Sequence, residues 1–142
     1  LKMQTNTTLI ISIVVVSLIV GGVLGSLSLQ KKPKLTLPAN AQKITDCFPS
    51  TGALYSVNWP AGPTYLLSPS DKRIIGAVYM TETKQQVETV LKDKFITLKN
   101  VGLDIEHVDV KFWSKGHGGY EQPHFDVYFY SVPHEIHDAI KC

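Results

Sequence analysis

The sequence predicts an α+β fold that is mainly antiparallel β-sheet, with one or two short helices and a separate apolar segment at the N-terminus. Two nine-residue runs, Ile105–Trp113 and His124–Val132, alternate apolar with polar side chains, which is the period of a β-strand. The run Thr81–Phe95 instead places apolar residues at helical spacing. The apolar segment, Leu9–Leu29, contains no charged residue. A tethered or exported small domain is therefore expected.

The N-terminal segment divides the 142-residue chain. About 20 apolar residues suffice to cross a bilayer as a helix. We therefore predict a flank at 1–8, a transmembrane anchor or signal peptide at 9–29, a linker at 30–45, and a single extracytoplasmic domain at 46–142. The anchored form gives a single-pass protein of the cell membrane. The alternative is secretion after signal cleavage, because Lys2 precedes the apolar core and small residues follow it.

The cysteines favour export. The chain has only two, Cys47 near the start of the predicted domain and Cys142 at its last residue. A disulfide between them would hold down the C-terminal tail and requires an oxidising compartment. The alternative is two unrelated free thiols.

Charge gives no indication of nucleic-acid binding. Four of the fourteen basic residues precede residue 39, which leaves ten against all twelve acidic residues in the remainder. The expected partners are the membrane, through the N-terminal helix, and either a second copy of the chain or a membrane protein.

In the first half of the domain, the sequence predicts little regular structure before a hairpin. Residues 47–63 are broken by prolines and glycines, so that only Ala53–Trp59 suits a strand. Thr64–Met80 predicts a hairpin around a Ser-Pro-Ser-Asp turn. The following helix, capped by Thr81 or Thr83, has an apolar face formed by Val87, Val90, Leu91 and Phe95.

The two alternating runs are expected to pair as an antiparallel hairpin. Their apolar faces match when Lys111 lies near Asp126 and Asp109 lies near Tyr128. A ten-residue glycine-rich loop joins the two strands. After them, Pro133–Lys141 predicts a short closing helix, because proline is well placed in a first helical turn.

The chemically active residues gather at this hairpin. His124 and Asp126 share one strand face, His117 lies in the loop before them, and His107 belongs to the neighbouring strand. Imidazole and carboxylate ligands suit a divalent transition metal such as zinc or copper. The four residues are therefore candidate metal ligands. The alternative is that His124 and Asp126 form a hydrogen-bonded pair on an exposed polar face.

Four further residues are expected to support this site from outside it: Glu121, Tyr128, His134 and His137. The last two stand three apart and share a helix face, but their spacing differs from the His-Glu-x-x-His of zinc proteases. We therefore interpret His134 and His137 as residues that open a helix. The chain contains neither a Gly-x-Ser-x-Gly motif nor a phosphate-binding glycine loop, and no enzymatic activity is predicted.

Two stretches resemble a family of small exported domains of unknown function in bacteria and archaea. They are GPTYLLSPSDKRIIGAVYM and HVDVKFWSKGHGGYEQPHFDVYFYSVPHEIHD, and the resemblance covers Trp59–Asp138. It implies an extracytoplasmic domain and a shared purpose for the His-Phe-Asp segment, but no activity. Where the family often has a histidine two residues after the aspartate, this chain has Tyr128. A phenol with a pKa of about 10 is a poor zinc ligand at neutral pH.

Two functional hypotheses follow. In the first, the domain binds a divalent metal or a small polar ligand through the histidine-rich hairpin. In the second, the domain is a non-enzymatic accessory subunit of a membrane complex or a self-assembling module, and the motif serves only the fold.

Overall fold

The computed structural model describes residues 34–117 and 120–142, and the predicted anchor Leu9–Leu29 lies outside them. Within these ranges no helix is long and apolar enough to cross a membrane. The elements are, in chain order, β1 (Gln42–Phe48), β2 (Gly52–Ser56), β3 (Thr64–Leu67), β4 (Ile74–Thr81), α2 (Lys84–Asn100), β5 (His107–Trp113), β6 (His124–Tyr130) and α3 (His134–Asp138). The predicted α+β class, mainly antiparallel, is confirmed.

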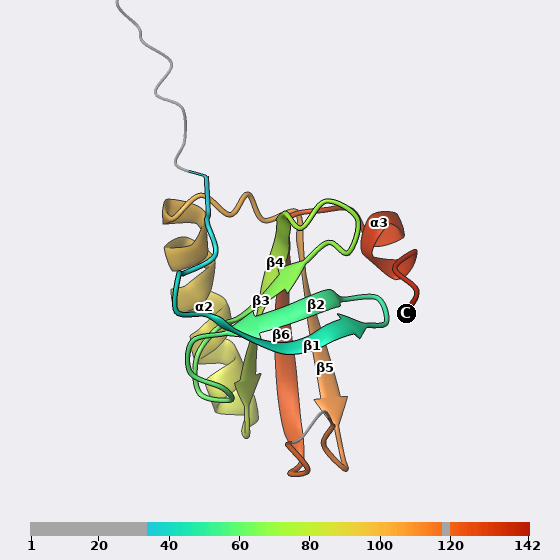
Figure 1. Ribbon diagram of the computed structural model, residues 1–142. Coiled ribbons are helices and arrows are strands. Elements are labelled where there is room, and N and C mark those ends of the chain that lie inside the picture. The colour runs from blue at the N-terminus through green and yellow to red at the C-terminus, as the bar shows by residue number, and fades with distance from the viewer. Residues whose placement is uncertain (1–33, 118–119) are drawn as a thin grey trace, which may run out of the picture. The chain divides into compact units, whose positions relative to one another are not determined.

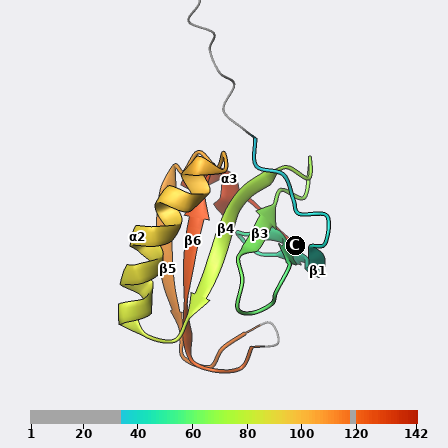
Figure 2. The ribbon, with the colours of Figure 1, turned by 90° about the vertical axis from the view of Figure 1, so that its left-hand side faces the viewer.

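The six strands form one strongly curled sheet. Their order is β1-β2-β3-β4-β6-β5, and every neighbouring pair is antiparallel. Figure 1 shows β1 and β2 crossing in front of β6 and β5, while Figure 2 shows α2 along the other side of the β4-β6-β5 portion. One face of β6 is therefore covered by the curl of the sheet and the other by α2.

Two apolar clusters fill these two spaces. One lies inside the curl and contains residues of β2, β3, β4 and β6, with Ile44 and Phe48 of β1 packed against it: Leu54, Leu66, Ile75, Val78, Tyr128, Tyr130 and Val132. The other lies beneath α2: Ala77, Val87, Leu98, Leu103, Val127 and Phe129. Six of the seven β6 residues are buried as a result.

Helix α2 begins where the sequence predicts. The Thr83 hydroxyl accepts a hydrogen bond from the Gln86 N–H at 3.2 Å, and the Gln86 side-chain oxygen accepts from the Thr83 N–H at 3.0 Å. This reciprocal pair satisfies two backbone donors at the helix start. The apolar face was predicted only in part, because Leu98 is buried whereas Phe95 is exposed.

Strand β1 was not predicted. Its residues fall partly in the predicted linker 30–45 and partly in the stretch where only Ala53–Trp59 suited a strand, yet Gln42–Phe48 pairs with β2. The pairing shifts register twice, between Lys43 and Thr45 and again between Thr45 and Phe48. Each irregularity interrupts the two-residue period, and the sequence therefore lacks the alternation that identifies a strand.

The predicted β5–β6 register is confirmed, since Lys111 pairs with Asp126 and Asp109 with Tyr128. The apolar faces are covered unequally, however. Helix α2 contacts β4 and β6, and β5 lies at the sheet edge. Val110 and Phe112 of β5 are consequently exposed, Phe112 by 56%.

Burial beside α2 makes the fold sensitive to alkaline pH. Burial raises the pKa of Tyr79 from 10 to about 12. The folded protein therefore holds this proton where the unfolded chain has released it, so stability should fall as pH rises from 10 to 12. We expect Tyr79→Phe to lose stability less steeply than the unsubstituted chain over that range. Urea unfolding at several pH values measures both slopes, and equal slopes would contradict the assignment.

Candidate metal-binding groups inside the curled sheet

Strand β6 carries His124, Asp126, Tyr128 and Tyr130 on the face that the curl covers. His124 is 0% exposed and Asp126 is 1% exposed. The alternative of a hydrogen-bonded pair on an exposed polar face is therefore wrong. Alternation correctly assigned the two residues to one face, but β1 and β2 return over that face from far away in the sequence.

The loop after β5 brings His117 back onto this face. Gly116 has a φ of +69°, and a Cβ there would collide with the Tyr120 carbonyl oxygen. His117 and Tyr120 then exchange two backbone hydrogen bonds of 3.0 Å. The turn holds the His117 imidazole 2.9 Å from Asp126 Oδ2, measured from Nε2.

One oxygen of Asp126 receives several hydrogen-bond donors. Trp113 Nε1–H donates to Oδ2 at 2.9 Å, and the Tyr128 hydroxyl donates to the same atom at 2.8 Å. The His117 Nε2 contact also ends there. Sequence reasoning missed Trp113, although the predicted register already placed it opposite His124. The carboxylate is therefore fixed in orientation.

The other oxygen faces a histidine without bonding to it. Asp126 Oδ1 and His124 Nε2 are both buried, lack a hydrogen-bond partner, and lie 3.4 Å apart. His124 Nδ1 lies 2.7 Å from the Gln122 carbonyl oxygen, which can only accept, so Nδ1 carries the ring proton. In the neutral imidazole a lone pair on Nε2 then faces a carboxylate oxygen. Two electron-rich atoms therefore face each other in the protein interior.

A cation would reconcile these two atoms. Metal–ligand bonds of about 2.0–2.2 Å at a tetrahedral ion hold neighbouring ligand atoms about 3.3–3.6 Å apart, which matches the separation of His124 Nε2 and Asp126 Oδ1. Ligand atoms of His117, His124 and Asp126 all lie within 4.8 Å of one another. A metal-bound histidine also usually donates its other N–H to a carbonyl or carboxylate, as His124 does to Gln122. We call these three residues the buried group.

His107 does not belong to the buried group, contrary to the prediction. It pairs with Tyr130, whereas Trp113, six residues further along β5, pairs with His124. At about 3.3 Å per residue the two positions are about 20 Å apart. The structure instead gathers His107 with Asp109, His134 and His137, within the same 4.8 Å limit. The interpretation of His134 and His137 as residues that merely open a helix is therefore incomplete, and we call this set the second group.

The remaining predicted residues differ in their placement. Tyr128 contacts Asp126 as a donor rather than as a ligand. Burial, followed by the nearby Asp126 carboxylate, raises the pKa of the Tyr128 hydroxyl, which favours the protonated donor. Glu121 is exposed and belongs to neither group. Cys47 and Cys142 form the predicted disulfide.

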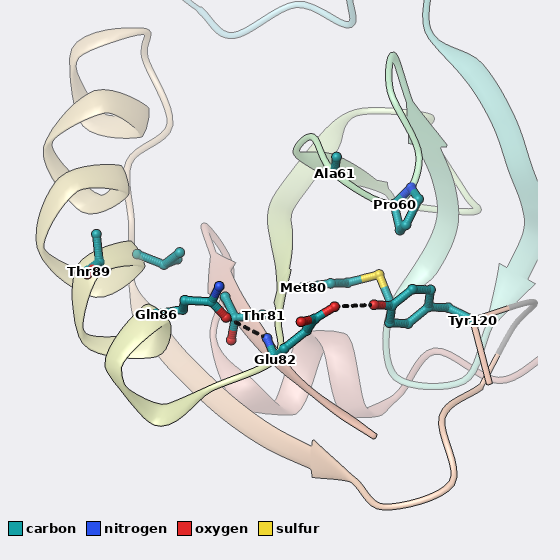
Figure 3. A pocket seen from close by; sticks show the side chains of 9 residues that line it. Pro60, Ala61, Met80, Thr81, Glu82, Gln86, Thr89 and Tyr120 are labelled. Atoms are coloured by element: carbon teal, nitrogen blue, oxygen red, sulfur yellow. Dashed lines mark hydrogen bonds between the residues drawn. The ribbon is translucent and has the colours of Figure 1, made fainter. Parts of the chain in front are cut away.

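Space around the buried group is limited. A cavity of about 10 Å³ touches His117, Asp126 and Tyr128, which is roughly the room that one water requires. A larger groove of about 560 Å³ lies outside, between Pro60 and the start of α2 (Figure 3). Tyr120 lines this groove and contacts the buried group, because its hydroxyl donates to Glu82 at 3.0 Å while its ring packs edge-on against His124. The buried group suits an ion with one small additional ligand better than it suits a substrate.

Comparison with known proteins supports the fold only. No protein-family model matches the chain, and no curated protein matches it. Among solved structures, the chain is similar to the crystal structure of the hypothetical protein TTHB210 from Thermus thermophilus, with 21% identity and a TM-score of 0.51. The similarity covers 73% of this chain and 95% of that one. The resemblance to the family of exported domains stays a prediction.

Proposed function

We propose that this domain binds a divalent transition metal, zinc or copper, at the buried group. The observation that carries the proposal is the pair of buried, unpartnered atoms, His124 Nε2 and Asp126 Oδ1, 3.4 Å apart. His117 supplies the third protein ligand by exchanging its 2.9 Å contact with Asp126 Oδ2 for a bond to the ion, and the small adjacent cavity leaves room for a water as the fourth. Imidazole and carboxylate ligands in this number suit zinc or copper.

A simple ion pair accounts less well for the same contacts. If His124 were protonated on both nitrogens, Nε2–H would face Asp126 Oδ1 at 3.4 Å, which is longer than a charge-assisted hydrogen bond of about 2.7–2.9 Å. The histidinium would also be fully buried, where desolvation offsets much of the attraction within a pair. A metal satisfies both atoms without requiring a charged imidazole.

We further propose that the domain acts outside the cytoplasm, tethered by its N-terminal segment. The disulfide supports an oxidising compartment, because such bonds persist there and are rare in the cytosol. A metal-binding domain in this position can hold, deliver or sense an ion at the outer side of the membrane.

Metal analysis of the purified full chain tests the proposal. After equilibration with zinc or copper(II) and removal of unbound ions, we expect His124→Ala and His117→Ala each to carry one equivalent less metal than the unsubstituted chain. The matched control is Glu121→Gln, which changes an exposed carboxylate on the same loop outside the group and should leave the metal content unchanged.

The structural alternative predicts a different result. If the motif serves only the fold, His124→Ala lowers Tm while the metal content of every variant stays equal to that of the unsubstituted chain. His117 is partly exposed, so its alanine variant should remain folded and keep the test decisive. Unchanged metal content in folded His117→Ala and His124→Ala would refute metal binding at the buried group.

A further inference from the structure

We propose a second, independent metal site, built from three histidines of the second group, with a preference for copper(II) or nickel(II). His107 comes from β5, and His134 and His137 come from α3. His137 Nε2 lies 3.1 Å from His107 Nε2 and 3.1 Å from His134 Nδ1. The three nitrogens are therefore already close to the spacing of ligand atoms around a single ion.

The proton on His137 is assigned by its other nitrogen. His137 Nδ1 lies 3.0 Å from the Ser50 carbonyl oxygen, which can only accept a hydrogen bond. The neutral ring therefore carries its proton on Nδ1 and presents the Nε2 lone pair to both other histidines. The Nε2 lone pair of His137 can accept one well-aligned hydrogen bond, so one of its two histidine neighbours is left without a good hydrogen bond to it. A single cation would instead accept a lone pair from each of the three rings.

Second contacts are within reach of two of the three imidazoles. If His134 binds through Nδ1, its Nε2–H points toward Asp109 Oδ1, 3.4 Å away. The hydrogen bond from His137 Nδ1 to the Ser50 carbonyl oxygen fixes the orientation of the buried His137 ring. Carboxylate–histidine–metal and carbonyl–histidine–metal arrangements of this kind are usual at metal sites, where they fix the ring and make the ligating nitrogen more basic.

Ring packing identifies which residues are fixed and which moves. The His137 ring stacks on Tyr130 with a centroid distance of 3.9 Å, and His107 stacks on the same tyrosine at 5.0 Å. The His134 ring stacks on the His107 ring with a centroid distance of 4.1 Å. In stacked rings the nitrogen lone pairs lie in two nearly parallel planes, so the two rings do not point their lone pairs at one ion. Binding therefore requires His134 to turn, and its side chain is free to do so because it is 54% exposed at the first residue of α3.

The site is accessible from the surface. A groove of about 390 Å³, bounded by the β1–β2 turn and by β5, reaches Asp109, Tyr130 and His137. Imidazole-rich sites suit copper, nickel and zinc, and affinity at a given site rises toward copper(II).

Copper(II) titration of the full chain tests the second site separately from the first. We expect two equivalents for the unsubstituted chain, with one lost in His134→Ala and in His107→Gln, and a different one lost in His124→Ala. Electron paramagnetic resonance should show several nitrogen ligands for the ion that His134→Ala removes. Asp109→Asn should weaken that ion's binding by about 10- to 100-fold.

Glu135→Ala is the matched control, because it changes an exposed residue of α3 between the two histidines. It should retain both equivalents and the same spectrum. His134 is also exposed, so the free energy of unfolding of its alanine variant should lie within about 0.5 kcal/mol of that of the unsubstituted chain. Thermal unfolding measures this difference. Two equivalents with unchanged spectra in folded His134→Ala and His107→Gln would overturn the proposal, whatever the result at His124.

Discussion

Asp126→Asn should abolish metal binding at the buried group and leave the fold intact, whereas Asp126→Ala should destabilise the protein by about 3–5 kcal/mol. The amide oxygen of asparagine can still accept from Trp113 and Tyr128, as Asp126 Oδ2 does. Its nitrogen would replace Oδ1 and could donate to the unpartnered His124 Nε2. Alanine offers no acceptor and leaves these donors unsatisfied in the interior.

The pair of variants separates ligand chemistry from packing. Metal analysis and denaturant unfolding should be run on both, each with and without a chelator. Chelation should lower the stability of the unsubstituted chain, because an ion bound only by the folded state stabilises it. In Asp126→Asn the chelator should have no effect on stability through the buried group, because that variant binds no metal there. An asparagine variant that binds as much metal as the unsubstituted chain would show that the carboxylate is not a ligand.

Loss of the disulfide should have the second large effect. Replacing both Cys47 and Cys142 by serine should cost about 2–5 kcal/mol of stability, because the bond joins residues 95 apart and restricts the unfolded chain strongly. For a domain of this size each kcal/mol lowers Tm by about 4–8 °C, so a fall of at least about 8 °C is expected. Thermal unfolding of the double variant measures it.

A reducing agent supplies the matched control. It should lower the Tm of the unsubstituted chain to nearly that of the double serine variant and leave the variant itself unchanged. The loss should also loosen α3, since the disulfide ties the chain end beyond α3 to β1. A Tm within about 2 °C of the unsubstituted value would mean that the closing helix is held by packing alone.

Local pattern predicted the central hairpin well. Nine-residue alternation identified β5 and β6, and matching their apolar faces gave the observed pairs Lys111–Asp126 and Asp109–Tyr128. The capping threonine of α2 was also evident. In each case the signal lies within residues that contact one another locally or across one turn.

Long-range closure could not be predicted in the same way. The polar face of β6 looked solvated because nothing in its own sequence indicates that β1 and β2 return over it. Strand β1 itself was obscured by two register shifts. The contact between Ser50 and His137 joins residues 87 positions apart, so the second group had no local signature. His107 was a different case, because the predicted register already placed it opposite Tyr130, away from His124.

The contacts that close the curl across the whole domain also govern when each group can form. Closing long loops is slow, since their entropy is lost before the distant contacts form. The residues of the β5–β6 hairpin lie close in sequence, so Trp113, His117 and Asp126 can approach early. Ser50 and His137 meet only when the two ends of the domain join. The contact by which Ser50 orients His137 should therefore form later in folding than the contacts among Trp113, His117 and Asp126.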